Sequence, residues 1–521
     1  MNWQAHLPAL LLAVPLLGAF ATPVFNLGGK TLRNVWFVTV STIVFLVALL
    51  LWHQVYLHGI QVYVMGGKTT TLTLPSGMKF PVRIILEVDA MSAFMALLGS
   101  IASMAGAWFS VSFMDKFTGL SRFVSLYFLL TVGMLGMMIT GDLFNFFVFI
   151  EIASVASYGL VAFWRDRPEA IEASFKYMLV SQIAAMLILI SLAFLYGRYD
   201  LLNMAALGSV MHMGLAEKVA LAFLISALAL KCGTFPMHTW LPDAYAEAPA
   251  GATCLLVAVS QASLYGLFRV CYSIYGVTMG SHVVPWIIIV LGLASMFFGV
   301  SMAVIQHEIK RLIGYHSVSQ VGYMLLGLGV GLLALGDPRS VAEYGFTAMK
   351  GGVYHILNYT MYKALLFLVA GSLYYMTGTR DLNKMGGLIR KAPLTAFMFA
   401  IAAAAIAGLP PMNGFVSKLL IYQSSFAVHP ALMVVALVTS ILTLASFVKI
   451  FQTAFLGPEQ KRMADVKKVP TTMLIGMGIL TVVVLFLSFF PTWSLSHLAE
   501  PAAKALLDQA GYMGAILGGA L

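Results

Sequence analysis

Residues 219–238 read VALAFLISALALKCGTFPMH, an apolar run that is interrupted first by a lysine and then by a proline. Before Lys231 the run holds only one polar residue, Ser226, and Gly233 and Pro236 follow it. Proline breaks or kinks the helix that contains it. A charged side chain in the middle of a membrane helix costs about 2.5–3.5 kcal/mol, and it persists where it is paired, hydrated or used. In a membrane protein, this stretch predicts a broken helix with a functional lysine.

The composition places the chain in a membrane. Its 521 residues are 60% hydrophobic and 10% charged, which excludes a soluble domain of this length. A spanning helix needs about 20 apolar residues, and about fourteen such segments recur along the chain. The predicted segments are 7–26, 34–57, 90–113, 123–140, 143–164, 173–196, 217–236, 250–277, 283–305, 312–335, 344–377, 395–428, 430–456 and 470–490. The fold class is therefore an all-α integral membrane protein.

Two of these segments share an interruption. The residues of 233–237 and 408–412 align as G-x-x-P-M, and Lys418 follows the second break in an apolar setting. Paired interrupted helices in corresponding halves are typical of inverted-repeat transporters. We therefore expect two inverted five-helix repeats, helices 4–8 and 9–13, with helices 7 and 12 broken.

The repeats predict four parts of the chain. The expected parts are 1–121 with helices 1–3 and a surface hairpin near 58–88, 122–280 with the first repeat, 281–457 with the second repeat, and 458–521 with helix 14 and an amphipathic tail. Lysine and arginine are concentrated in the odd-numbered connections, so we expect these connections in the cytoplasm and both termini outside the cell membrane. The net charge of +10 reflects this asymmetry and does not indicate nucleic-acid binding.

The sequence predicts no cofactor or metal in this chain. Its three cysteines fall within predicted helices without a CxxC motif, and there is no GxGxxG motif after a strand and no P-loop. Any energy that drives transport is therefore expected to come from elsewhere.

Titratable residues inside predicted helices are the candidate site. Glu151 lies in the apolar run FFVFIEIA, and at about 6 Å from Lys231 their attraction would be about 3 kcal/mol, enough to couple their protonation. His238, His316 and His355 titrate near neutral pH and could relay protons together with Lys363. The alternatives are a static ion pair and hydrogen-bonded core histidines. We interpret Asp142, Asp243 and Glu247, at helix ends, as capping or loop residues.

Five stretches resemble one family of membrane subunits. They are DLFNFFVFIE (142–151), KCGTFPMHTWLPDAYAEAP (231–249), HEIKRLIGYHS (307–317), KALLF (363–367) and GLPPMNGFVSK (408–418). In this order they resemble the antiporter-like family, which comprises proton-pumping subunits of respiratory complex I, Mrp-type cation/proton antiporters and energy-converting hydrogenases. The chain looks most similar to the branch of the Mrp D subunits, which includes the equivalent subunits of archaeal membrane-bound hydrogenase and sulfur-reducing complexes.

The resemblance implies roles for particular residues. Glu151 would pair with Lys231, Lys418 would lie on the exit side, and His355 and Lys363 would link the two halves. The chain departs from the family at Gln261, where many members have a lysine, and at Tyr245, where many have a histidine. The eighth-helix link would then need His238, water or a neighbouring group.

The favoured function is that of a proton-translocating subunit in a multi-subunit membrane complex driven by electron transfer. The expected partners are other antiporter-like and small membrane subunits, lipid, and peripheral redox subunits, with protons and in some complexes sodium as the transported ions. A component of a standalone Mrp antiporter is the alternative, and a scaffold with buried ion pairs is the third hypothesis.

Overall fold

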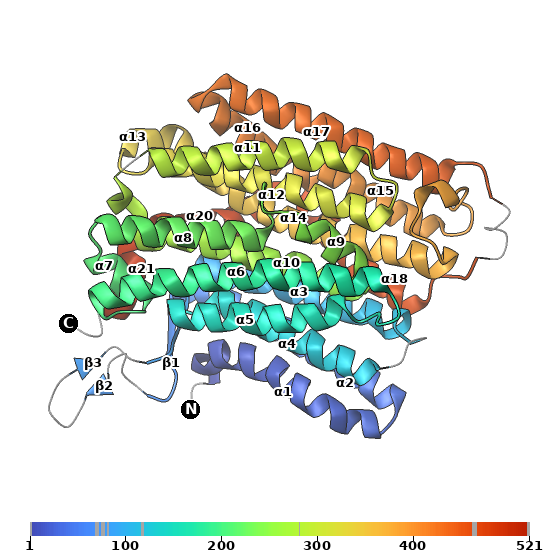
Figure 1. Cartoon of the computed structure of the whole chain (residues 1–521), viewed down its shortest axis with the longest axis horizontal. Coiled ribbons are helices and arrows are strands. Elements are labelled where there is room, and N and C mark those ends of the chain that lie inside the picture. Colours follow the sequence, from blue (N-terminus) through green and yellow to red (C-terminus); the bar gives the residue numbers. More distant parts are fainter. Residues whose placement is uncertain are drawn as a thin grey trace.

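The structure is a computed structural model that describes residues 3–67, 72–73, 79–80, 83–115, 119–280, 282–460 and 466–517. It is a bundle of long helices that run side by side. Figure 1 shows the β-strands and both chain ends at the same end of this bundle. The α5–α6 connection lies at the opposite end.

Within the described residues, twelve helices are long and apolar enough to cross a membrane. Their main segments are α1 (Leu7–Leu27), α2 (Lys30–His58), α3 (Ala90–Phe113), α4 (Leu120–Ile139), α5 (Leu143–Val161), α6 (Pro168–Tyr199), α10 (Ala250–Phe268), α11 (Val283–Val304), α12 (Ile309–Ala334), α14 (Phe346–Thr377), α17 (Pro430–Ile450) and α18 (Thr471–Phe489). The prediction of an all-α integral membrane protein is confirmed. The two other predicted segments are the interrupted ones.

Both interruptions have the same local geometry. The first separates α8 (Leu215–Cys232) from α9 (Trp240–Glu247), and the second separates α15 (Pro393–Ala407) from α16 (Asn413–Val428). Gly233 and Gly408 end their helices with φ angles of +80° and +77°. The next amide, of Thr234 or of Leu409, donates to the carbonyl five residues back, at 2.9 and 3.0 Å. This is the Schellman motif, and only glycine adopts its left-handed position without strain.

Three helices form the centre of the bundle. α10, α12 and α14 are buried around nearly their whole circumference, whereas α1, α2, α6, α11 and α17 bury less than half of their most apolar window. A helix that is apolar on all sides and buried is a core helix. Most polar side chains of α10, α12 and α14 are therefore buried inside the bundle.

The shorter elements lie at the ends of the bundle. β1 (Gln61–Val64) pairs antiparallel with β4 (Ile85–Val88), and β2 (Leu72–Thr73) pairs with β3 (Lys79–Phe80). The rest of the predicted hairpin, at 68–71, 74–78 and 81–82, lies outside the described residues. The remaining short helices are η1 (Trp3–His6), α7 (Met204–Val210), η2 (Arg269–Tyr275), η3 (Gly276–Met279), α13 (Pro338–Ser340), η4 (Val341–Gly345), η5 (Leu382–Lys384), η6 (Phe451–Leu456), α19 (Pro491–Ser494), η8 (Leu495–Ala499), α20 (Glu500–Leu507) and α21 (Gln509–Leu517).

Candidate functional site: buried lysines, histidines and hydroxyl groups

Lys231 lies at the end of α8, with 5% of its surface exposed. Its Nζ donates to Ser154 Oγ on α5 at 2.6 Å and to the Ser181 hydroxyl on α6. Ser181 Oγ also donates to Ser154 Oγ at 3.3 Å. The lysine is therefore held by hydroxyl groups from two neighbouring helices. Such hydrogen bonds satisfy the ammonium group in a site that water does not reach freely.

Glu151 lies one turn before Ser154 on α5 and is half-buried. Its Oε2 accepts a hydrogen bond from Gln182 Nε2 at 3.3 Å. No ion pair between Glu151 and Lys231 lies within 4.0 Å among the described residues, because Ser154 occupies the position facing the ammonium group. The two side chains therefore have different hydrogen-bond partners, and among the described residues no hydrogen bond joins Glu151 to the Ser154 or Ser181 hydroxyl. The carboxylate is still near enough to act on the charge of Lys231.

A small cavity lies on the other side of Lys231. Ser260 and Ser263 of α10 line it together with Tyr245 of α9 and Tyr177 of α6. Its size is sufficient for about one water molecule. Gln261, which replaces the family's lysine, is buried and donates to Ser260 Oγ at 3.4 Å. Hydroxyl groups on either side of Gln261, from Ser260 and Ser263, therefore line the cavity at this point of α10.

α14 brings the next polar groups close to this cavity. Tyr359 Oη lies near the hydroxyls of Ser260 on α10 and Ser317 on α12, but it forms no hydrogen bond within 3.5 Å among the described residues. Lys363 follows one turn later, with its Nζ 5.9 Å from the centre of the Tyr359 ring. Lys363 is fully buried, and its Nζ has no hydrogen-bond partner in the described part of the chain.

The charges of two lysines act on His316 of α12. Both Lys363 and Lys418 are close enough to act on its charge. The ring packs against Phe447 with centroids 4.8 Å apart, and neither ring nitrogen has a hydrogen-bond partner among the residues described. A buried histidine is ordinarily hydrogen-bonded. Among the described residues, His316 is therefore not the hydrogen-bonded core histidine that was the alternative to a relay role.

Lys418 on α16 spans the second break and binds the end of α15. Its Nζ donates to Ile406 O at 2.8 Å and to Ser440 Oγ of α17 at 3.0 Å. The carbonyl belongs to the last turn of α15, where backbone acceptors are free and the helix dipole is negative. The side chain passes so close to Gly408 that a Cβ there would lie 2.9 Å from Lys418 Cδ.

His355 on α14 is joined to the same region by hydrogen bonds. Its Nδ1 lies 2.9 Å from Ser417 Oγ, next to Lys418 in the chain, and its Nε2 lies 3.2 Å from Gln320 Oε1. His238 is placed differently. Its ring packs beside Phe235 and Tyr315, with centroids 5.5 and 6.4 Å away, and it is not among the residues that line the Lys231 cavity. The structure therefore brings together all the predicted residues except His238.

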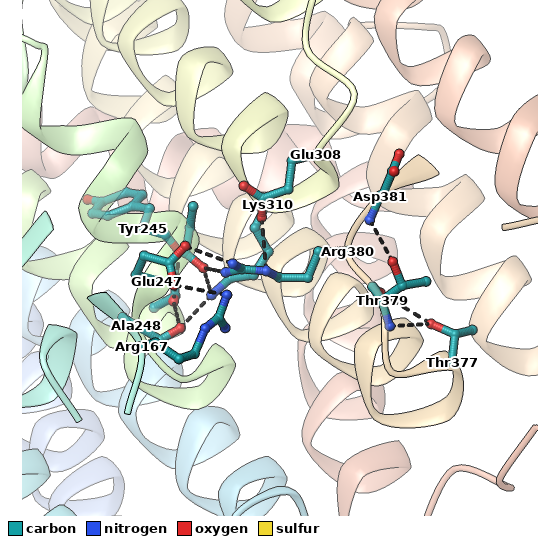
Figure 2. A network of polar contacts seen from close by, with 12 residues as sticks. Arg167, Tyr245, Glu247, Ala248, Glu308, Lys310, Thr377, Thr379, Arg380 and Asp381 are labelled. Carbon is teal, nitrogen blue, oxygen red and sulfur yellow. Dashed lines mark hydrogen bonds and ion pairs between the residues drawn. The ribbon is translucent and has the colours of Figure 1, made fainter. Parts of the chain in front are cut away.

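A second polar cluster lies where the two predicted repeats meet. Figure 2 shows Arg380 reaching toward Glu247, with Arg167, Glu308 and Lys310 around them. Arg380 Nη2 lies 2.7 Å from Glu247 Oε1, and Arg380 Nε lies 3.3 Å from Glu308 Oε1. Glu247 was expected to be a capping or loop residue, and Asp243 pairs with Arg311 at 3.1 Å. Asp243 and Glu247 thus lie in the first turn and at the last residue of α9 and form ion pairs there, whereas Asp142 caps α5 by accepting from the Asn145 amide at 2.8 Å.

A third cluster lies at the opposite end of α10. Arg269, fully buried in η2, forms an ion pair with Asp89 at the start of α3. Glu87 in β4 is also buried, beside Arg269 and Tyr512 of α21. Burial raises the pKa of the Glu87 carboxyl well above its usual range, against the opposing effect of the Arg269 charge.

The helices, the two breaks and the buried lysines define an integral, multi-pass membrane subunit of the antiporter-like class. The chain belongs to the family described as NADH:quinone oxidoreductase/Mrp antiporter, which matches residues 140–443. The matched region includes Glu151 through Lys418, so it covers all of the candidate residues. The prediction of an antiporter-like subunit of Mrp or complex I type is confirmed.

Individual relatives agree with this assignment. The chain is 35% identical to the D subunit of the Na(+)/H(+) antiporter of Alkalihalophilus pseudofirmus over 427 residues, 81% of each protein. It superimposes with a TM-score of 0.87 on a chain of the Mrp complex from Dietzia sp. DQ12-45-1b, at 28% identity, covering 99% of this chain and 100% of that one. A chain of the membrane-bound sulfane sulfur reductase, an archaeal respiratory membrane complex, gives a TM-score of 0.85 at 28% identity, covering 98% and 99%.

Proposed function

We propose that this chain translocates protons along the buried polar groups that run from Glu151 and Lys231 to Lys418. The observation that supports this is their succession across six helices, α5, α8, α10, α14, α12 and α16. Lys231 adjoins the cavity with Ser260, Tyr359 lies near Ser260, and Lys363 follows Tyr359. His316 lies in electrostatic range of both Lys363 and Lys418.

The geometry favours an electrostatic relay. A unit charge at about 6 Å from another changes its energy by about 3 kcal/mol at an effective dielectric near 20. Losing a proton at one lysine therefore changes the proton affinity of its neighbour without a large motion. The hydroxyl groups of Ser154 and Ser181 beside Lys231 suit this mechanism, because a serine hydroxyl can both donate and accept a hydrogen bond. Gln261 and His355 flank the route and orient its polar groups, and His238 lies at its edge.

We place the chain in the cell membrane with its odd-numbered connections in the cytoplasm and both termini outside. The excess of lysine and arginine in the odd connections supports this orientation. The four parts 1–121, 122–280, 281–457 and 458–521 are proposed as its structural units. In this arrangement the Arg380 cluster faces the cytoplasm and the Arg269 cluster faces the exterior.

The proposed setting is a multi-subunit complex driven by electron transfer in partner subunits. The likeness to a chain of the sulfane sulfur reductase supports it. The alternative, a standalone Mrp-type Na⁺/H⁺ antiporter, is supported by the 35% identity to the D subunit of such an antiporter. Purifying the native complex and identifying its subunits decides between them. Redox subunits support the first setting, and Mrp-type subunits alone support the second.

The proton route is tested with Lys231→Ala and Lys418→Ala in the native complex reconstituted into vesicles. We expect both variants to assemble and to lose proton translocation, measured with a pH-sensitive dye. The exposed Lys384→Ala variant is the control, and it should behave as the parent. Normal translocation in the assembled Lys231→Ala and Lys418→Ala complexes would leave only a scaffold role for the two lysines.

A further inference from the structure

A hollow with a volume of about 440 Å³ opens at the meeting point of the two predicted repeats. We call it the vestibule. It is lined almost entirely by charged side chains from the start of α6, the end of α9 and the start of α12. Ion pairs already cross it, with Lys176 Nζ 3.3 Å and Arg311 Nη2 3.1 Å from the Asp243 carboxylate.

The Glu247–Arg380 ion pair lies between the vestibule and a smaller inner pocket. Both residues line both spaces. Their side chains are only 8% and 13% exposed, and Arg380 Nη1 also donates to Ala246 O at 2.6 Å. Because Arg380 pairs with Glu308 as well, it fastens the end of α9 to the start of α12. An ion pair in this position separates the outer space from the inner one (Figure 2).

The inner pocket contains a buried lysine. Lys310 is 4% exposed, and its Nζ donates to Ala246 O at 2.9 Å and to Ala248 O at 2.5 Å. Ala246 lies in the last turn of α9, and Ala248 lies in the connection to α10. The charges that face Glu247 are thus Arg167, Arg380 and Lys310, with Glu308 next to them.

α9 joins this cluster to the Lys231 cavity. The helix has only eight residues, so its ends are about 12 Å apart. Glu247 at one end is held by Arg380, and Trp240 at the other end donates from Nε1 to Leu230 O at 3.1 Å, next to Lys231. Trp240 and Tyr245 both line the Lys231 cavity. A displacement of α9 therefore changes the ion pair and the cavity together.

We propose that the Glu247–Arg380 ion pair is a latch that closes the Lys231 cavity to the vestibule, and that the vestibule takes up protons for Lys231. When the pair opens, the end of α9 is released and water reaches Ser260. When the pair re-forms, the cavity is closed to the vestibule again. The inference rests on the proposed proton route, and it assigns Arg380 and Glu247 as positioning residues.

The latch is tested by the accessibility of the cavity. Ser260→Cys is introduced with Cys232→Ala, Cys254→Ala and Cys271→Ala, and the complex is treated with silver ion, which is small and binds thiolates. The blocked fraction is measured by maleimide labelling after denaturation. Arg380→Gln should speed modification by about tenfold or more, the effect expected from losing a hydrogen bond between charged groups. Arg380→Lys, which keeps the charge but not the separate contacts to Ala246 and Glu308, should give a rate between those of the parent and Arg380→Gln.

Lys384→Gln is the matched control, because Lys384 forms an exposed ion pair with Asp381 in the same connection. It should leave the rate unchanged. An unchanged rate in assembled Arg380→Gln, or an equal increase in Lys384→Gln, overturns the latch. Translocation by Lys231→Ala separates the two ideas. If that variant still pumps, the proton route is wrong. If it does not pump and Arg380→Gln is modified slowly, only the latch is wrong.

Discussion

Lys231 is bound by serine hydroxyls, not by a carboxylate. A direct ion pair would hold the proton on the lysine, because separating two buried charges is costly. Hydroxyl groups stabilise the ammonium less strongly and can accept or donate in turn. The hydroxyl groups of Ser154 and Ser181 therefore allow Lys231 to lose and regain a proton. Glu151 is not bound to Lys231 and acts on it only through its charge.

Ser154→Ala combined with Ser181→Ala is expected to slow proton translocation by roughly tenfold or more, since hydrogen bonds to a charged group contribute about 1.5–3 kcal/mol. The measurement is the initial rate of dye response in reconstituted vesicles. Ser191→Ala is the control, because Ser191 is also buried on α6 but donates to Ala220 O at 2.8 Å, away from Lys231. Equal rates in the double variant and the control would contradict a role of Ser154 and Ser181 in proton translocation.

Glu87 makes a second prediction at this scale, on stability and pH. Burial raises the pKa of Glu87 in the folded protein. The carboxyl thus holds its proton more tightly when folded, and its contribution to stability is complete below about 4.3, the usual value for glutamate. It is lost as pH rises through the higher folded value. As pH rises, the melting temperature of the parent should therefore fall more than the melting temperature of the Glu87→Gln variant.

Melting curves at a series of pH values above the usual glutamate pKa give the comparison. Glu343→Gln, a change at an exposed glutamate, serves as the control and should parallel the parent. If Glu87→Gln follows the parent at every pH, Glu87 is not a buried neutral acid.

The two Schellman breaks are the element that fixes the site. Each break lies close to a buried lysine, Lys231 or Lys418. At the end of α15 the Ile406 carbonyl has no partner within the helix, and Lys418 donates to it. The breaks were predictable because glycine and proline mark them in the sequence. The helical segments were predictable because apolar runs of about 20 residues are the length that spans a bilayer and are rare in soluble domains.

Gly408→Ala is expected to destabilise the protein more than Gly378→Ala. Both glycines have positive φ angles, +77° and +71°, so both variants lose about 1–2 kcal/mol in the left-handed region. Only at Gly408 would the new Cβ meet a side chain, 2.9 Å from Lys418 Cδ, whereas nothing lies within 4 Å at Gly378. Thermal unfolding of both variants measures the difference, and equal losses would show that the close approach to Lys418 has no cost.

The contacts between elements were less predictable. Ser154 could have been found from the sequence, because it lies one turn from Glu151 on the same helix face. Ser181, Ser260, Tyr359 and Ser440 could not, because serine and tyrosine are common in such helices and their partners are distant in sequence. The Glu247–Arg380 ion pair could not be predicted, because pairing between segments remote in sequence leaves no local signal.

At the scale of the whole molecule, the buried Asp89–Arg269 ion pair fastens three distant parts together. It joins the start of α3 to η2, and Tyr512 of α21 stacks on the same guanidinium, with the ring centre 4.7 Å from Arg269 Cζ. The amphipathic tail expected after Pro491 is thereby anchored to the body of the bundle.

Asp89→Asn is expected to destabilise the protein by about 3–5 kcal/mol, since it leaves a buried charge without its partner. Asparagine still caps α3, so the helix start is preserved. Asp115→Asn removes an exposed ion pair with Lys30 and should cost about 0–1 kcal/mol. Chemical denaturation of the two variants in detergent gives the comparison, and similar losses would contradict the importance of the buried pair.

The two breaks also have an electrical consequence. Figure 1 shows α9 following α8, and α15 following α16, along the length of the bundle, so each break lies partway along it, and Lys363 lies near the middle of α14. Transfers between these lysines therefore run parallel to the membrane plane, at nearly constant depth. Moving one charge through the full membrane potential takes about 2.3 kcal/mol per 100 mV. Along the proposed route, almost all of this work falls on the uptake and release steps, so voltage should change those rates and leave the internal transfers nearly unaffected.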